Sequence, residues 1–169
     1  IEDTEISFGL NDVYKLHAVY ESSDDNPPKI PYIVLSEATF FAPGTVITGG
    51  TSGARAIVVS FINSTLRLYN VDLNGSAFSP GETVTGVDAD NNVLTATIDD
   101  ADGSVEKGSK VITNQYELNQ AQNPFFYDVS RLVRKPGTTP PTRQLMAVFD
   151  YFIHEASGDY FSGQSYTGI

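Results

Sequence analysis

Residues 144–154 read Gln-Leu-Met-Ala-Val-Phe-Asp-Tyr-Phe-Ile-His, a nearly continuous apolar run. In an extended strand the odd positions from 145 to 153 are all apolar, and so are 146, 148 and 152 on the other face. Only Asp150 and His154 interrupt the pattern. A strand that is apolar on both faces is normally covered on both sides, so we predict a central strand. A buried helix is the competing reading, but the flanking Pro140-Pro141 and Gly158 and the aromatic content favour a strand.

Two N-terminal segments predict further strands. Residues 13–20 alternate as a half-exposed antiparallel strand does, and residues 30–35 form a shorter one that Pro31 restricts to an edge or a strand start. The polar, Pro-ended stretch 21–28 between them predicts a loop.

An internal repeat lies in the middle of the chain. Residues 41–49, Phe-Ala-Pro-Gly-Thr-Val-Ile-Thr-Gly, recur 37 positions later at 78–86 as Phe-Ser-Pro-Gly-Glu-Thr-Val-Thr-Gly. Pro-Gly predicts a tight turn, the Phe before it can plug a barrel end, and Val/Ile-Thr starts a strand. Further strands are predicted at 56–61, 65–71 and 93–98, with a turn at Asn63-Ser64. Five short strands within about 60 residues indicate a small closed or half-closed barrel.

The remaining third of the chain is less regular. Residues 109–113 predict a short strand, and residues 157–161 are expected to turn the chain back for a last short strand. Residues 114–136 have neither a helical nor a strand period, and Pro124 excludes one continuous helix, so we expect a short helix or an irregular aromatic loop. The fold class is therefore all-β: an antiparallel β-sandwich-like domain from 1–36 and 104–169, with 37–103 inserted as a small β-barrel. One continuous sandwich is the alternative.

Composition limits the function classes. The 169 residues include no cysteine, which excludes disulfides, zinc–thiolate sites and thiol nucleophiles. The formal charge of −11 and the pI near 4.3 argue against nucleic-acid binding. No apolar run approaches the roughly 20 residues of a membrane helix, and the opening Ile-Glu-Asp-Thr-Glu is not a signal peptide. From its two ends we expect the chain to be a segment of a longer polypeptide.

One acidic stretch superficially copies a calcium loop. Asp88, Asp90 and Asn92 alternate, and Asp99 falls at the twelfth position. The sixth position is Val93 instead of glycine, and the residues after it predict a strand, so we expect a polar hairpin turn. For Asp99, Asp100 and Asp102 we likewise expect a solvated turn and no metal.

No catalytic constellation is evident. His17 and His154 are the two histidines, no Gly-x-Ser-x-Gly elbow accompanies them, and we expect strand histidines at a surface or interface. The glycine-rich stretch 49–53 lacks the lysine and the helix of a phosphate loop. We expect no enzyme, no cofactor and no metal site.

Basic residues concentrate near the C-terminal third, at Arg131, Arg134, Lys135 and Arg143. The interpretation we favour is pairing with Asp128, Asp150 or carboxylates of a neighbouring subunit. The alternative is binding of an anionic glycan.

The ordered set of short motifs resembles a recurrent module of large virion proteins in tailed bacteriophages, notably tail-baseplate and fibre proteins of marine cyanobacterial phages. The matching pieces are 12–16, 19–22, the repeated Phe-x-Pro-Gly-x-x-Val-Thr-Gly with 51–54, 116–119, 126–131, 149–152, 159–161 and 165–166. They span nearly the whole chain. The family commonly has Gly-Gln-Arg-Asp where this chain has Ala-Gln-Asn-Pro at 121–124, so no role for that loop is carried over. The resemblance implies a structural part with no catalytic residues.

The expected function is thus a non-enzymatic structural module of a phage tail, baseplate or fibre, located in the virion after assembly in the host cytoplasm. Its expected partners are other virion proteins or copies of itself. The alternative is a host-receptor or glycan-binding module of a tail adhesin. In that alternative, exposed Tyr20, Tyr69 or Tyr160 beside Arg67 or Arg143 would contact the sugar. An accessory domain of a secreted enzyme is a third, weaker reading.

Overall fold

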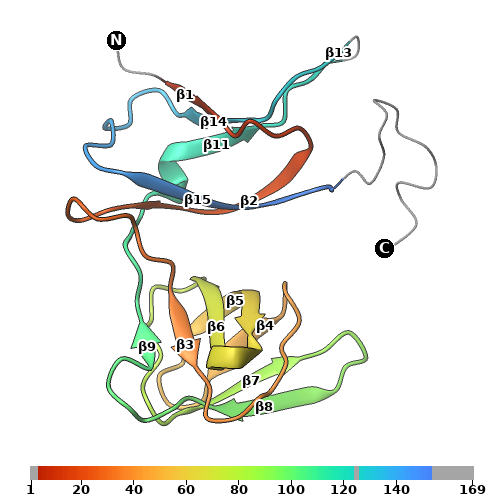
Figure 1. Ribbon diagram of the computed structural model, residues 1–169, viewed down its shortest axis with the longest axis vertical. Coiled ribbons are helices and arrows are strands. Elements are labelled where there is room, and N and C mark those ends of the chain that lie inside the picture. Colours follow the sequence, from red (N-terminus) through yellow and green to blue (C-terminus); the bar gives the residue numbers. More distant parts are fainter. Residues whose placement is uncertain (1–3, 124–125, 154–169) are drawn as a thin grey trace. The chain divides into compact units, whose positions relative to one another are not determined.

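The computed structural model describes residues 4–123 and 126–153 (Figure 1). The described chain is built from antiparallel strands and two short 3-10 turns, η1 (Asn63–Thr65) and η2 (Thr113–Gln115), which confirms the predicted all-β class. The strands are β1 (Glu5–Ser7), β2 (Val13–Glu21), β3 (Tyr32–Val34), β4 (Val46–Gly49), β5 (Arg55–Ile62), β6 (Arg67–Asp72), β7 (Thr83–Val87), β8 (Val93–Thr97), β9 (Val105–Glu106), β10 (Lys110–Val111), β11 (Tyr116–Asn119), β12 (Gln122–Asn123), β13 (Phe126–Tyr127), β14 (Arg131–Arg134) and β15 (Leu145–Tyr151).

The chain divides into two compact units. Unit 1 comprises Ile1–His17, Thr113–Pro140 and Ala147–Ile169, and unit 2 comprises Ala18–Ile112 and Pro141–Met146. Strands β2 and β15 each run from one unit into the other. The chain therefore leaves unit 1 and returns to it.

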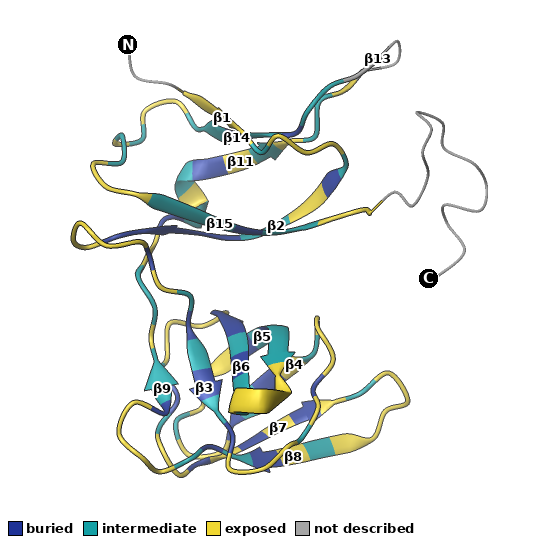
Figure 2. Cartoon of the chain, viewed as in Figure 1, coloured by how far each residue is buried: buried dark blue, intermediate teal, exposed yellow. Residues whose placement is uncertain are grey.

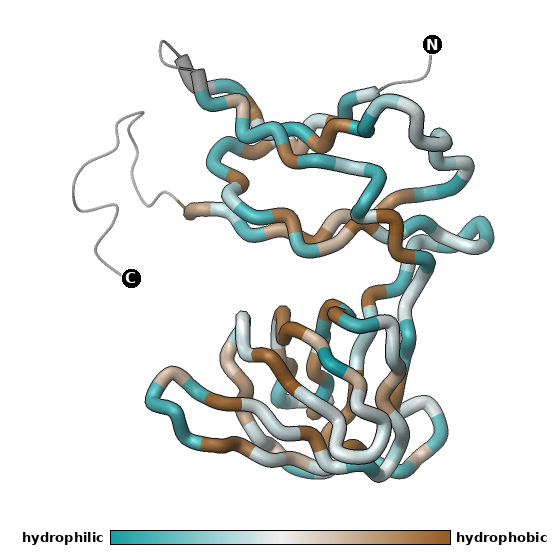
Figure 3. Tube along the Cα trace, turned by 180° about the vertical axis from the view of Figure 1, so that it is seen from behind, coloured by the Kyte–Doolittle hydropathy of each residue, from teal (hydrophilic) through white to brown (hydrophobic). Residues whose placement is uncertain are grey.

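Unit 2 is organised around a seven-stranded antiparallel sheet with the order β8-β7-β4-β5-β6-β3-β9. Leu35 and Ile98, which follow β3 and β8, form a bridge, and the Ser36 N–H donates to the Thr97 carbonyl at 2.9 Å. The sheet thus curls into a partly closed barrel. Buried positions alternate with less buried ones along β4, β7 and the first half of β5, as a sheet with one buried face requires. Figure 3 colours the chain by hydropathy.

One apolar core lies inside this barrel (Figure 2). Both phenylalanines of the repeat, Phe41 and Phe78, belong to it, as the barrel-plug expectation proposed. Its other members are Ile33, Leu35, Ile47, Ala54, Ala56, Val58, Leu68, Val84, Ala96 and Ile98.

The barrel is longer at both ends than the predicted insert 37–103. Strand β3 supplies Ile33 to the core, and β9 pairs with β3, yet both strands lie outside those bounds. The two ends of the larger segment meet: the Ser109 N–H donates to the Lys29 carbonyl and the Lys29 N–H donates to Ser109 Oγ, both at 2.9 Å. Residues 29–109 are therefore the natural limits of the barrel.

We expect a fragment of residues 29–109 to fold alone and to give a dispersed amide spectrum. A fragment of residues 37–103 should give a collapsed one, because it lacks β3, β9 and the closing bridge. Recording nitrogen–proton correlation spectra of both fragments checks this. Equal dispersion in the two spectra would contradict the role given to β3, and two collapsed spectra would reject an autonomous barrel.

Three small sheets complete the described fold. Their strand orders are β1-β14-β11, β10-β2-β15 and β12-β13. Within unit 1, the Phe8 and Phe149 rings lie 4.4 Å apart, and Ser130 Oγ accepts a hydrogen bond from the Val13 N–H at 3.3 Å. These contacts are consistent with the predicted sandwich-like arrangement.

The prediction that residues 144–154 form a central strand is right about the strand and wrong about its place. Among the described strands β15 is at the end of its sheet and β2 is in the middle. Val148 is the one buried residue of β15, whereas β2 is buried at Val13 and from Ala18 to Glu21. An apolar pattern shows which faces avoid water, but pairing with distant residues decides which strand is central.

The prediction of a helix or irregular loop at 114–136 is wrong. After the η2 turn the chain forms β11 and β14, which pair antiparallel from Tyr116↔Arg134 to Asn119↔Arg131, and β1 covers the other edge of β14. A weak local pattern became strand because partners elsewhere in the chain supply the hydrogen bonds. The turn expected at 157–161 and the last strand expected with it lie outside the described residues.

A buried carboxylate attaches 141–146 to β2. Glu21 Oε1 accepts the Thr142 N–H at 2.9 Å, and Glu21 Oε2 accepts Lys110 Nζ at 3.0 Å. The Thr142 hydrogen bond, followed by the one from Lys110, lowers the pKa of the Glu21 carboxyl. This contact explains why Pro141–Met146 belongs to unit 2 although the rest of β15 does not.

Candidate functional site

The duplicated motif forms a pseudo-two-fold strand pair. Strands β4 and β7 are antiparallel neighbours, and Thr48 lies opposite Thr85, its counterpart in the other copy. Ile47 lies opposite Gly86, and Gly49 lies opposite Val84, so each apolar residue faces the glycine of the other copy. The two copies are thus related by a local two-fold axis between the threonines.

The Pro-Gly turns obey the same symmetry. In the first copy the Gly44 N–H donates to the Val58 carbonyl at 2.8 Å, and the Val58 N–H donates to the Thr45 carbonyl at 2.9 Å. In the second copy Gly81, Ile98 and Glu82 make the equivalent bonds at 3.2 and 2.9 Å. Each Pro-Gly turn is therefore bound by two backbone hydrogen bonds to the returning arm of the hairpin that follows it.

The fifth motif position breaks the symmetry chemically. It is Thr45 in the first copy and Glu82 in the second, and each lies against the motif glycine of the other copy. An added Cβ at Gly86 would lie 3.0 Å from Thr45 Cγ2, and one at Gly49 would lie 2.8 Å from both Glu82 carboxylate oxygens. The closing glycines are needed because the other copy approaches so closely.

Glu82 is only 4% exposed, and its carboxylate accepts hydrogen bonds from several surrounding donors. Oε2 accepts the N–H groups of Thr51 and Ser52 at 3.0 and 2.9 Å. Oε1 accepts the Ser52 hydroxyl and the Ser79 N–H, both at 2.7 Å. Successive backbone N–H groups that converge in this way form an anion-binding nest.

These bonds control the ionisation of Glu82. Burial acts to raise its pKa, but the hydrogen bonds from Ser52, Ser79 and Thr51 together outweigh burial and lower the pKa of the Glu82 carboxyl below its ordinary value. The glycine-rich stretch 49–53 therefore binds an anion without being a phosphate loop. The anion is the Glu82 carboxylate of the same chain. The sequence signal for Glu82 was a lone acidic residue at a repeated turn position where the other copy has threonine.

The calcium-like stretch forms a polar hairpin turn between β7 and β8. Asp88 Oδ1 accepts the N–H groups of Asp90 and Asn92 at 2.9 and 2.8 Å, and Asp88 Oδ2 accepts the Asn92 amide at 3.0 Å. Val93 begins β8. Asp99 Oδ1 likewise accepts the Ala101 N–H at 2.8 Å. Within 4–123 and 126–153, no group of three His, Asp or Glu side chains is placed to hold a metal ion.

We expect isothermal titration of the protein with calcium chloride to give no binding heat. The first potential ligand, Asp88, already accepts three hydrogen bonds within its own turn, and a strand starts where a calcium loop needs its glycine. A dissociation constant in the micromolar range or tighter would contradict this prediction.

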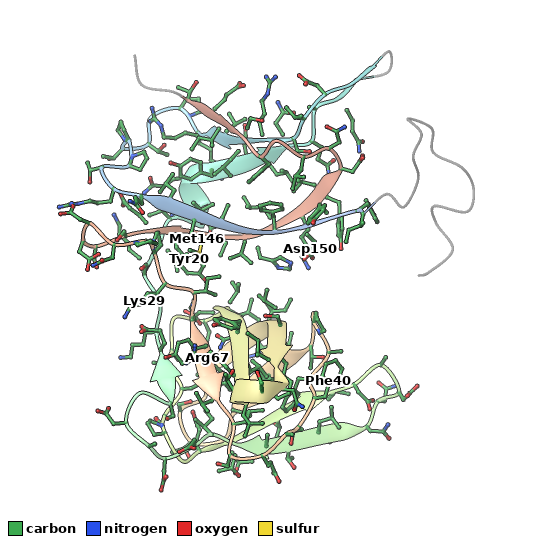
Figure 4. The ribbon with its side chains drawn as sticks, in the orientation of Figure 1. Tyr20, Lys29, Phe40, Arg67, Met146 and Asp150 are labelled. Carbon is green, nitrogen blue, oxygen red and sulfur yellow. The ribbon has the colours of Figure 1, made fainter. Side chains whose placement is uncertain are left out.

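The structure pairs His17 with Asp150 across β2 and β15. His17 Nε2 and Asp150 Oδ2 lie 2.7 Å apart, and the His17 side chain is largely buried (Figure 4 labels Asp150). The surface position expected for His17 is therefore wrong, because His17 makes a cross-strand contact, and the interface alternative stays a prediction. His154 lies outside the described residues.

Each residue of the basic cluster contacts a group elsewhere in the described chain. Arg131 pairs with Asp128 at 2.8 Å, as predicted, and with Glu5 at 3.3 Å. Arg143 pairs with Asp25, and Asp150 is taken by His17 instead of an arginine. The other two cations bind carbonyls: Arg134 that of Thr138 and Lys135 that of Asn114. Arg131 and Arg143 thus form ion pairs with carboxylates of the same chain.

The tyrosines named in the glycan-binding alternative differ in their burial and in their neighbours. Tyr20 is 0% exposed, and burial, followed by the negative charge of Asp72, raises the pKa of its phenol to about 12, so the premise of an exposed Tyr20 is wrong. Tyr69 and Arg67 do lie together, with Arg67 4.2 Å from the centre of the Tyr32 ring. Tyr160 lies outside the described residues.

Apolar side chains in unit 1 gather around the end of β15. We call Tyr14, Tyr151, Phe152 and Ile153 the aromatic end of β15. All four are exposed, Ile153 to 77%, and the Tyr14 and Phe152 rings lie 4.5 Å apart. Exposed apolar groups that contact one another on a strand mark a surface suited to another protein.

No family model, curated protein or solved structure matches this chain. No helix in the described part of the chain is long and apolar enough to cross a membrane.

Proposed function

We propose that the chain is a non-enzymatic structural module of a phage tail, baseplate or fibre protein, which assembles through its β surfaces with copies of itself or with other virion proteins. The observation that carries this proposal is the position of β15. It is the last strand in its sheet among the described strands, and the exposed aromatic end of β15 continues from it.

The edge of β15 that pairs with no described strand can bind a further strand. A strand at the end of a sheet presents backbone N–H and C=O groups to a further strand, and proteins that stay monomeric usually protect such edges with charges or proline. From 145 to 151 the sequence has one charged residue, Asp150, and that residue is bound to His17. The edge therefore has little protection against a partner strand.

Composition and sequence resemblance support the same role. The ordered motifs resemble modules of virion proteins of tailed phages, in which a structural role is expected. A net charge of −11 keeps such a chain dispersed until a complementary surface approaches it.

Electron microscopy of an intact particle that carries this chain tests the proposal. We expect density of a neighbouring subunit against β15 and its aromatic end. Phe152→Ser and Tyr14→Ser should lower the incorporation of the chain into particles. The matched control is Val93→Ser, which removes an exposed apolar side chain from β8 in unit 2. A freely projecting module with a solvent-exposed β15, or equal incorporation of all three variants, would reject the proposal.

Receptor binding is the second candidate function. The residues that favour it are Tyr32, Tyr69 and Arg67, which gather on one surface of β3 and β6. A glycan-array signal that Tyr32→Ala abolishes would support this candidate, and an array without signal would remove it.

A further inference from the structure

Unit 2 contains a small cavity between the end of β6 and β9. Its volume is about 130 Å³, and its apolar floor is formed by Ala56, Phe78 and Val105. Tyr32 lines one side, and its ring is held in place by Arg67 at 4.2 Å from its centre and by Tyr69 at 5.9 Å between ring centres. Cavities with an apolar floor and a few polar groups at the mouth of a barrel are the usual sites for small ligands.

The polar group that points to a ligand is Asn70. The residue is 3% exposed and lines the cavity, and its backbone N–H donates to the Pro31 carbonyl at 3.0 Å. Its side-chain amide has no hydrogen-bond partner in the part of the chain that the structure describes. An amide offers two donors and one acceptor. The Asn70 amide is not among the fully buried side-chain atoms that lack a partner, and Asn70 lines the cavity, so a ligand in the cavity can pair with the amide.

Charges of both signs lie at and beside the cavity. Asp72 and Glu106 bring two carboxylates, and both are already engaged: Asp72 Oδ2 accepts the Gly75 N–H at 2.9 Å, and Glu106 Oε2 accepts Lys29 Nζ at 3.1 Å. Lys107 lines the cavity, and two further cations lie beside its walls: Lys29, labelled in Figure 4, on Glu106, and Arg67 on the Tyr32 ring. Because neither sign of charge is alone at the site, we expect a neutral ligand instead of an ion.

We propose that this cavity binds one neutral, hydroxyl-bearing ring, namely a single sugar residue at the end of a glycan. The amide of Asn70 pairs with one sugar hydroxyl, and the carboxylate of Asp72 or Glu106 accepts from another. The C–H face of the sugar packs on the apolar floor. The cavity accommodates one ring and no extended chain. This inference does not depend on the assembly role, because the cavity and the aromatic end of β15 belong to different units.

Titration of the isotope-labelled chain with methyl glycosides of glucose, galactose, mannose and N-acetylglucosamine tests the proposal by NMR. We expect saturable shifts of the Asn70 side-chain amide and of the Tyr32 and Glu106 backbone amides with at least one of them. The dissociation constant should be in the millimolar range, as small ligands with few contacts show, and should not change with salt.

Two variants locate the site. Ser76→Trp places a large ring at the exposed rim of the cavity and should weaken binding by about ten-fold or more. Ser64→Trp, in the η1 turn away from the cavity lining, should leave binding unchanged. Asn70→Ala should also lose binding, with thermal unfolding used to verify its fold.

The proposal is overturned by the absence of saturable shifts with all four glycosides, or by equal binding in Ser76→Trp and the unmodified chain. It is also overturned if N-acetylneuraminic acid or glucosamine binds more tightly with an affinity that falls as salt is added, because the site would then select a charged ligand.

Discussion

Glu82→Ala should lower the free energy of unfolding of this protein by about 3 kcal/mol, because it removes the buried acceptor of three part-buried hydrogen bonds from the N–H groups of Thr51, Ser52 and Ser79. Hydrogen bonds to a charged acceptor contribute more than neutral ones, and here they connect the turn after β4 to the turn before β7. Losing them therefore loosens both copies of the repeat at once.

Urea denaturation of the purified chain measures this loss. Glu82→Gln keeps the shape but replaces one carboxylate oxygen with a donor that faces other donors, so we expect it to lose nearly as much. Glu37→Ala is the matched control, since Glu37 is exposed and its change should remain within about 0.5 kcal/mol. A loss below about 1 kcal/mol for Glu82→Ala would show that water replaces the carboxylate without penalty.

The same contact predicts an acid dependence. Because the folded-state pKa of Glu82 is lowered, its ionised form stabilises the fold fully above the ordinary carboxyl pKa, and this stabilisation is lost as the pH falls through the lowered folded-state value. The stability difference between the unmodified chain and Glu82→Gln should therefore shrink on acidification. A difference that stays constant down to the acid transition would contradict an ionised Glu82.

Gly49→Ala is the second substitution with a large expected effect, about 2 kcal/mol of destabilisation. The added Cβ would lie 2.5 Å from Ser52 Oγ and 2.8 Å from the Glu82 carboxylate oxygens. Both contacts are with movable ends of side chains, so the clash is relieved only if the carboxylate leaves its donors. The symmetry-related Gly86→Ala should be less harmful, because its nearest contacts, Thr45 and Phe41, lie at 3.0 and 3.1 Å.

A double-mutant cycle separates this steric explanation from a simple change in strand propensity at Gly49. In the Glu82→Ala background, Gly49→Ala should cost at least about 1 kcal/mol less than in the unmodified chain, because the clashing carboxylate is absent. Gly86→Ala is the control pair: it does not contact Glu82, so the two losses should add. Additive losses for Gly49 and Glu82 would disprove the steric link.

Local pattern was sufficient for the strands whose residues alternate and whose ends are turns. Residues 13–20 and 65–71 were predicted and are found in β2 and β6, and the turn at Asn63-Ser64 is the η1 turn. In these segments the period of two and the turn residues are properties of neighbouring residues. Residues 114–136 were missed because β11 and β14 owe their form to each other and to β1.

The candidate sites were less accessible to prediction. Asp88, singled out for its spacing, proved to be part of a turn, and Tyr20, singled out as an aromatic, proved to be buried. Glu82 and Asn70, which have the more unusual surroundings, belong to no motif by themselves. Their chemistry comes from donors and cavity walls contributed by other strands.

The sequence by itself determined the all-β class, the positions of most strands and the two Pro-Gly turns, because alternation and turn chemistry act over a few residues. Only the tertiary structure decided that β4 pairs with β7 about a local two-fold axis, that Glu82 closes the loop after β4, and that β15 ends its sheet instead of lying in the middle. Each of these depends on which distant segments meet, and a local pattern of apolar and polar residues is compatible with several such pairings.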